Sequence, residues 1–90
     1  MPNVILSGVL RSIAGGNSSL SVSGCTLAEV LQNLGASHPD IGRALFGETG
    51  QLRAHYIVRL ENQIVRQDEL AARRVDDTSH ITIYPVMAGG

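Results

Sequence analysis

The sequence predicts an α+β fold in which one main helix packs on a mixed sheet of about five strands. The first observation is the length of 90 residues, which allows one domain with a single modest core. The second is composition: 43% of the residues are hydrophobic but only 3% are aromatic, which predicts an aliphatic core. The third is periodicity, because residues 27–37 repeat apolar side chains at helical spacing while most other apolar segments alternate as strands do.

The N-terminal segment is predicted to form a β-hairpin. Residues 4–10 are rich in Val, Ile and Leu and alternate imperfectly between apolar and polar. Residues 14–17 read Ala-Gly-Gly-Asn, a composition typical of turns, and residues 18–22 supply the returning strand.

The main helix is expected over residues 27–37. Thr26 and Glu29 have the spacing of a capping box at its start, and a residue that precedes a proline, here His38 before Pro39, is displaced from the helical region at its end. The apolar residues at helical spacing are Leu27, Val30, Leu31 and Leu34. Residues 41–46 are predicted to form a second short helical turn.

The C-terminal half is predicted to contain three strands. A loop at residues 47–50, held to the core by Leu52, precedes a strand in which Tyr56, Val58 and Leu60 share one face and Ile57 and Arg59 share the other. Residues 61–63 turn into a strand at 64–66, and residues 76–79 turn into a final strand in which Ile81 and Ile83 alternate with polar neighbours. With the first and last strands paired centrally, this order gives a β-grasp arrangement.

The chain stops directly after this last strand with Gly89-Gly90. Two consecutive glycines form a narrow and flexible strip of backbone that can thread an enzyme cleft. From Pro85 to Gly90 the extended chain spans roughly 20 Å, so the terminal carboxylate can reach a catalytic centre while the folded body stays outside. We therefore divide the chain into a β-grasp domain, residues 1–86, and a flexible tail, residues 87–90.

Charge and composition argue against several other functions. The formal net charge is −1 and the seven Arg residues are scattered, so nucleic-acid binding is not expected. No apolar run approaches the ~20 residues of a membrane span, and residues 1–10 do not resemble a signal peptide, so a cytoplasmic protein is expected. Cys25 is the single cysteine and is predicted to be a small buried residue, and His38, His55 and His80 lack the spacing of metal ligands. We expect no metal site, no bound cofactor and no catalytic residues in the chain itself.

The whole chain resembles the ubiquitin-like sulfur carriers, which include the small subunit of molybdopterin synthase and the carriers of thiamine and cysteine synthesis. The most specific resemblance is residues 81–90, where a hydrophobic strand, a proline and a tail of small residues precede Gly-Gly. Further similar segments are Val9-Leu10-Arg11 with Gly15-Gly16, Thr26-Leu27 with Val30-Leu31, His38-Pro39-Asp40-Ile41 with Arg43 and Leu45, and residues 60–66. The sequence departs from the family pattern at Glu61-Asn62, Thr78-Ser79 and Met87.

This resemblance implies a mechanism and a set of partners. A ubiquitin-activating-type adenylyltransferase would join the Gly90 carboxylate to AMP with ATP and magnesium. A persulfide from a cysteine desulfurase or a rhodanese-like protein would then displace AMP, leaving a thiocarboxylate that donates its sulfur to a biosynthetic acceptor enzyme. The carrier would act as a protein cosubstrate, with ATP and Mg used by the activating partner.

The same resemblance assigns roles to the residues around the C-terminus. Gly90 would carry the sulfur, and Met87, Ala88 and Gly89 would enter the partner's active site. A docking patch beside the tail is predicted on the exposed faces of the last strands; its members are Ile57, Arg59, Thr82, Tyr84, Pro85 and Val86.

Three other functions remain open on sequence alone. The alternatives are the small subunit of molybdopterin synthase, a protein modifier that forms isopeptide bonds through Gly90, and a binding domain whose tail has no role. The loop from Pro39 to Ala54 makes the chain longer than typical thiamine carriers and argues mildly against that pathway.

Overall fold

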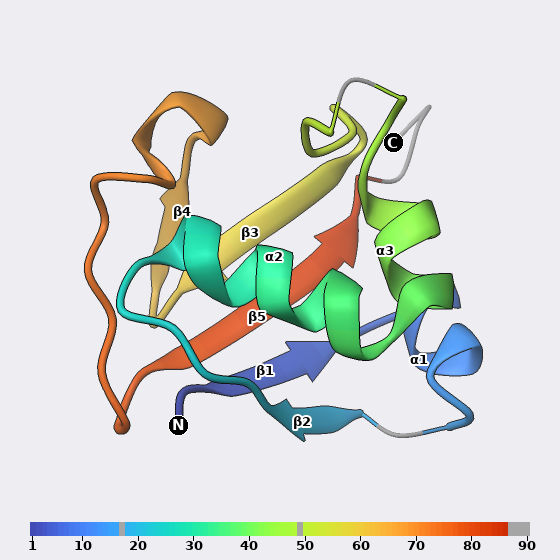
Figure 1. Ribbon diagram of the computed structural model, residues 1–90, viewed down its shortest axis with the longest axis horizontal. Helices are drawn as coiled ribbons and strands as arrows, with labels where there is room; N and C mark the ends of the chain where they lie inside the picture. Colours follow the sequence, from blue (N-terminus) through green and yellow to red (C-terminus); the bar gives the residue numbers. More distant parts are fainter. Residues whose placement is uncertain (17, 49, 87–90) are drawn as a thin grey trace.

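The computed structural model describes residues 1–16, 18–48 and 50–86. Five strands form one mixed sheet in the order β2-β1-β5-β3-β4, and their bounds are β1 Asn3–Leu6, β2 Ser19–Ser21, β3 Tyr56–Leu60, β4 Gln63–Val65 and β5 His80–Pro85. The first and last strands, β1 and β5, pair in parallel at the centre, and the other neighbours pair antiparallel. The predicted β-grasp topology is therefore confirmed (Figure 1).

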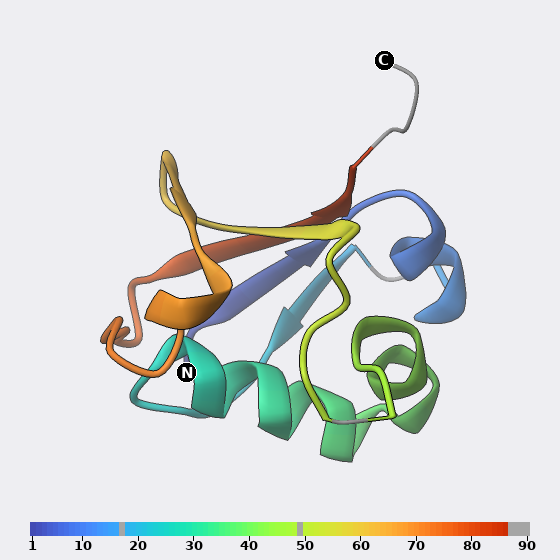
Figure 2. The same cartoon turned by 90° about the horizontal axis from the view of Figure 1, so that it is seen from above.

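Helices lie over one face of this sheet. The main helix α2, Leu27–Ser37, crosses the strands, and α3, Pro39–Leu45, follows it; a short helix α1, Val9–Ile13, and a 3₁₀ turn η1, Gln67–Glu69, complete the fold. Viewed along the sheet, α2 and α3 lie on one side, and the opposite face is left uncovered by the described helices (Figure 2).

The bounds of α2 agree with the predicted range. Thr26 is its N-cap: the Thr26 hydroxyl oxygen accepts a hydrogen bond from the Glu29 backbone N–H at 3.2 Å. The Glu29 carboxylate accepts in return from the backbone N–H of Cys25 at 3.1 Å, one residue earlier than in the usual capping box. His38 ends α2 and Pro39 begins α3, which confirms the predicted break. The second helical segment exists, but it spans residues 39–45 rather than the predicted 41–46.

The N-terminal hairpin was predicted correctly in its pairing but not in its length. β1 ends at Leu6. Gly8 then turns the chain with φ 64° and ψ −135°, a conformation that residues other than glycine rarely adopt, so the strand cannot continue through it. Leu10 is therefore carried on α1, where it is 0% exposed, rather than on a strand. Leu6 and Leu10 are four residues apart and both buried. This spacing fits both a continuous strand and a strand followed by a helix, so the sequence pattern could not decide between them.

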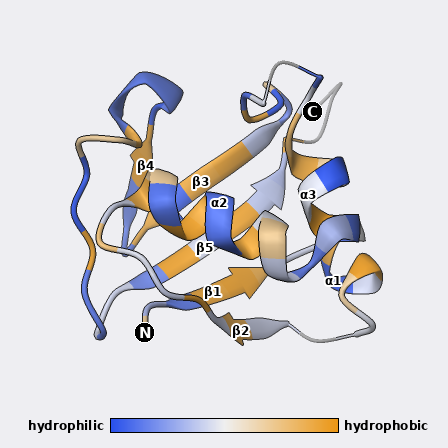
Figure 3. Ribbon diagram, in the orientation of Figure 1, coloured by the Kyte–Doolittle hydropathy of each residue, from blue (hydrophilic) through white to orange (hydrophobic). Residues whose placement is uncertain are grey.

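The core lies between the sheet and the helices and is aliphatic, as predicted. The apolar colouring gathers on the central strands and along one side of α2 (Figure 3). Its buried members are Val4, Leu6, Leu10, Val22, Leu27, Val30, Leu31, Leu34, Ile41, Leu45, Leu52, Tyr56, Val58, Val65, Leu70, Ile81 and Ile83. Leu52 is buried and forms a β-bridge with Phe46, which confirms that Leu52 joins the chain after α3 to the core.

Candidate docking face and tail root

The root of the tail is the end of the central strand β5. Pro85 lies opposite Tyr56 in the β3–β5 register, and the Val86 backbone N–H donates to the His55 carbonyl oxygen at 2.6 Å. Tyr56 is itself held, because its backbone N–H donates to the Arg53 carbonyl oxygen at 3.1 Å. Residues 85 and 86 are thus attached to the chain segment that enters β3.

Four of the six predicted docking residues lie together on the open face of the sheet. Ile57 lies directly opposite Tyr84, and Arg59 lies directly opposite Thr82. The Arg59 guanidinium carbon lies 5.9 Å from the centroid of the Tyr84 ring, a cation–π distance. Because strand residues alternate between faces, these side chains point away from α2, while Val58, Ile81 and Ile83 point toward it.

The predicted docking residues are exposed enough for a partner protein to contact them. Ile57, Thr82, Tyr84 and Pro85 are partly exposed, Arg59 is exposed, and Val86 is 47% exposed. The sheet therefore presents apolar atoms and one cation next to the strand that leads to Gly90. The structure brings Ile57, Arg59, Thr82 and Tyr84 to one open face of the sheet. Alternation places Pro85 on the other face, with Ile81 and Ile83, at the end of β5 next to Val86.

Two residues of this face were missed from the sequence. Ile64 on β4 is 62% exposed and lies opposite Arg59, and Ile5 on β1 is half-buried and lies opposite Thr82. They extend the surface across neighbouring strands in the row Ile5, Thr82, Arg59, Ile64. The signal that identifies Ile5 is alternation, since it lies between the inward-facing Val4 and Leu6.

The opposite end of β5 carries a polar turn. The pKa of Asp76 is lowered from its ordinary value, chiefly because the Thr78 hydroxyl donates to its carboxylate at 2.7 Å and the Thr78 backbone N–H donates at 2.9 Å. The Ser79 backbone N–H donates to the Asp76 carbonyl oxygen, which closes the predicted turn at residues 76–79. This charge lies away from the tail root, because His80 begins β5 and Pro85 ends it.

Other candidate features lie outside this face. Cys25 is exposed rather than buried. It precedes the helix cap, and its backbone N–H and C=O form hydrogen bonds with Glu29 and Val75. Within residues 1–16, 18–48 and 50–86, no group of three or more His, Cys, Asp or Glu residues is placed to hold a metal ion. In the same ranges no helix is long and apolar enough to cross a membrane.

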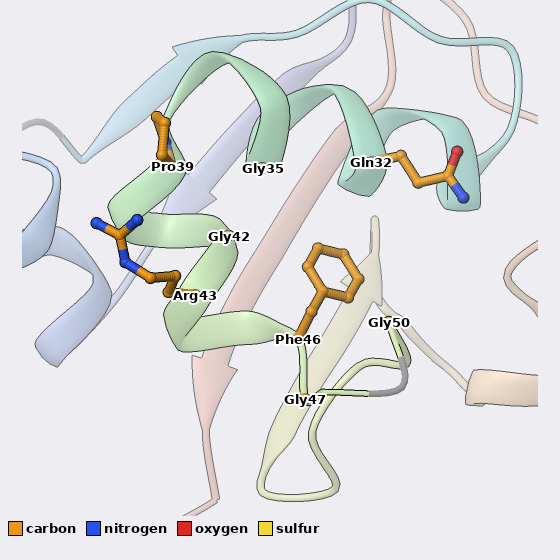
Figure 4. A pocket seen from close by; sticks show the side chains of 8 residues that line it. All are labelled: Gln32, Gly35, Pro39, Gly42, Arg43, Phe46, Gly47 and Gly50. Atoms are coloured by element: carbon orange, nitrogen blue, oxygen red, sulfur yellow. The ribbon is translucent and has the colours of Figure 1, made fainter.

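A shallow hollow of about 470 Å³ lies on the helical side. It is bordered by α2, α3 and the following loop, and its lining residues are Gln32, Gly35, Pro39, Gly42, Arg43, Phe46, Gly47 and Gly50. In Figure 4 the Phe46 ring lies between α2 and the loop, while the Arg43 side chain projects in another direction. None of the docking residues borders this hollow, so it is separate from the candidate site. The predicted tail residues, Met87 to Gly90, lie outside the described residues.

The fold defines a ubiquitin-like β-grasp protein. Residues 4–90 match the model of the ThiS family, and the chain belongs to this family.

Curated and solved relatives agree with that assignment. The chain is 32% identical over 84 residues to the sulfur carrier protein CysO of Mycobacterium tuberculosis, covering 91% of this chain and 90% of that protein. The crystal structure of the Amycolatopsis orientalis BexX/CysO complex contains a chain with a TM-score of 0.83 at 28% identity, with full coverage of both chains. Mycobacterium tuberculosis CysO itself superposes with a TM-score of 0.82 at 28% identity, covering 97% of this chain and 100% of that one. The small archaeal modifier protein 1 of Methanosarcina acetivorans shares the fold, with a TM-score of 0.85 at 24% identity over 99% of this chain and 95% of that one.

Proposed function

We propose that this chain is a sulfur carrier that transports sulfur as a thiocarboxylate on Gly90. The observation that carries the proposal is the family match, which runs through the last strand to residue 90 and so includes Gly89-Gly90. The 32% identity to sulfur carriers over nearly the whole chain supports the same function.

The proposed reaction begins at the carboxylate. An α-carboxyl group is ionised at neutral pH, so one of its oxygens can attack the α-phosphorus of ATP and release pyrophosphate. The terminal sulfur of a protein persulfide then attacks the acyl carbon, and AMP leaves. A thiol cleaves the resulting acyl disulfide, which leaves the thiocarboxylate on Gly90 and a disulfide on the donor side.

The chain's own part in this reaction is to dock and to present its tail. The open face around Ile57, Arg59 and Tyr84 supports docking, because it is exposed and adjoins the root of the tail. ATP and magnesium are used by the adenylyltransferase, and the sulfur comes from a cysteine desulfurase or a rhodanese-like protein. The chain supplies no catalytic group and acts in the cytoplasm, where these partners meet it.

The acceptor we propose is an enzyme of the cysteine-synthesis type. The curated relatives at 32% identity are named sulfur carrier protein CysO, and a solved relative is a CysO in complex with BexX. Thiazole synthesis and molybdopterin synthesis are the competing destinations of the sulfur.

Intact mass measurement tests the function directly. The protein is incubated without oxygen with an adenylyltransferase that activates CysO-type carriers, Mg-ATP and a persulfide donor. We expect the mass increase of one oxygen replaced by one sulfur, and no increase when ATP is omitted or Gly90 is deleted. An unchanged mass with an enzyme that converts its own carrier would contradict the proposal, and adducts on the amines of other proteins would indicate a modifier instead.

A further inference from the structure

The turn that follows β1 contacts the root of the tail. Gly8 has φ 64° and ψ −135°, a region that is essentially restricted to glycine. Its neighbours fix it in place: the Ser7 backbone N–H donates to the Ile83 carbonyl oxygen at 3.2 Å, and the Arg11 backbone N–H donates to the Gly8 carbonyl oxygen at 3.2 Å. Gly8 is therefore held against the last residues of β5.

The space beside Gly8 is filled by the Pro85 ring. A Cβ on Gly8 would lie 3.3 Å from Pro85 Cγ and 3.4 Å from Pro85 Cδ. These distances are shorter than normal carbon–carbon contacts of about 3.5–4.0 Å. Its backbone conformation favours glycine at this position, and a side chain here would press on the proline ring and shift it by a few tenths of an ångström.

Pro85 is also held from its other side. It lies opposite Tyr56 on β3, and the next residue, Val86, is tied to His55 by a backbone hydrogen bond of 2.6 Å. The proline ring adds a fixed φ at the same point. Contacts from β1 and from β3 therefore meet at the residue pair from which the tail departs.

We propose that Gly8 is a positioning residue that seats Pro85 and so sets the direction in which the tail leaves the sheet. This inference rests on the proposed function. A carrier docked through its open face delivers Gly90 to the partner's catalytic centre only when the tail starts in the right direction. Misplacement of a reacting group by about 1 Å can reduce a rate by about a hundredfold, so a small shift at the root matters.

The proposal predicts different effects on docking, seen in KM, and on tail insertion, seen in kcat, when the carrier is adenylated. Gly8 is not one of the docking residues, and a small shift of Pro85 leaves Ile57, Arg59, Thr82 and Tyr84 in place on the open face. The shift lowers the fraction of bound carriers whose tail is correctly inserted. In the adenylation reaction Gly8→Ala is expected to lower kcat at least about fivefold while KM stays within about twofold. Hydrogen exchange of the Val86 amide is expected to accelerate, because the displaced Pro85 loosens the bond to His55.

Two control variants distinguish contact with Pro85 from backbone strain. Gly15 has φ 72° and a Cβ there would meet nothing within 4 Å, so Gly15→Ala imposes a positive φ without a contact and is expected to keep kcat. Gly8→D-Ala relieves the strain and puts the methyl group at the other α position; it is accessible by joining synthetic residues 1–24 to residues 25–90 at Cys25. We expect this variant to behave as the wild type.

The outcomes are distinct from failure of the proposed function. If the wild type is adenylated and Gly8→Ala retains both kcat and slow Val86 exchange, the positioning role is wrong. It is also wrong if Gly8→D-Ala and Gly8→Ala lose kcat equally, or if the loss appears in KM alone. Should Gly8→Ala not fold, as judged by circular dichroism, Pro85→Ala replaces it: a lower kcat with faster Val86 exchange supports the proposal, and an unchanged kcat overturns it. A wild type that is never adenylated contradicts the sulfur-carrier function instead.

Discussion

Gly35 on α2 and Gly42 on α3 lie in backbone contact. A Cβ on Gly42 would lie 3.0 Å from both the Cα and the carbonyl oxygen of Gly35, and a Cβ on Gly35 would lie 3.3 Å from the Gly42 Cα. The two helices can approach this closely only because neither residue has a side chain. The contact directs α3 back over the sheet, where Ile41 and Leu45 become buried.

Gly42→Ala is therefore expected to destabilise the fold. Higher helix propensity favours alanine by up to about 1 kcal/mol, but overpacking against a backbone costs about 1–3 kcal/mol, so we expect a net loss of up to about 2 kcal/mol. Denaturant unfolding measures it. Gly47→Ala is the control, because its Cβ would lie 4.0 Å from the Gln51 carbonyl oxygen. A Gly42→Ala variant at least as stable as the wild type would show that the helices separate without cost.

Leu10→Ala tests the placement of α1 in the core. Leu10 is 0% exposed, and removal of a buried leucine side chain costs about 2–5 kcal/mol of unfolding free energy. Ile64→Ala is the matched control, because Ile64 is 62% exposed and its truncation is expected to change stability by less than about 0.5 kcal/mol. Equal effects in thermal or denaturant unfolding would contradict the burial of Leu10.

Thr26→Ala is expected to weaken the start of α2. It removes the hydroxyl oxygen that accepts from the Glu29 backbone N–H and should reduce the unfolding free energy by about 1 kcal/mol. Thr26→Ser keeps that acceptor and should remain within a few tenths of the wild-type value. A serine variant as unstable as the alanine variant would indicate that the methyl group matters more than the cap.

The Asp76 turn predicts a stability that falls in acid. The folded-state pKa of Asp76 lies below its ordinary value of 3.8, so the carboxylate stabilises the fold above pH 3.8, and this contribution is lost as the pH falls through the folded-state pKa. Thr78→Ala removes the hydroxyl that contributes most and should raise the pKa of Asp76 toward its ordinary value, as followed by NMR titration. Thr78→Ser keeps the hydroxyl and should keep the lowered pKa. An unchanged titration in the alanine variant would assign the shift to other groups.

Tyr84→Ala tests the docking face. Loss of the ring removes apolar contact area and the partner of Arg59, so we expect KM for the adenylyltransferase to rise about tenfold while kcat stays near the wild-type value. Gln32→Ala, on the helical side beside the hollow, is the control and should change neither constant. If both variants bind as the wild type does, the partner uses another surface.

Much of the fold was accessible from the sequence because its signals are local. The helix at residues 27–37 has both a cap and an apolar period, and the strand at residues 56–60 alternates cleanly, so each was predicted within its observed bounds. The extent of β1 was not, because a short apolar run with Gly8 inside it satisfies a long strand and a strand followed by a helix equally. Cys25 was misplaced for a similar reason: residue type favours burial, but its position before a cap exposes it.

The sequence by itself determined the β-grasp order of elements and the aliphatic core, because periodicity and turn composition act over a few neighbouring positions. Only the tertiary structure decided the register between neighbouring strands, and with it which side chains share a face. It placed Ile5 and Ile64 in the row with Thr82 and Arg59, and it brought Gly8 against Pro85 across 77 positions of chain. Such contacts arise from sheet register and close packing between segments far apart in the chain, so local sequence patterns do not predict them.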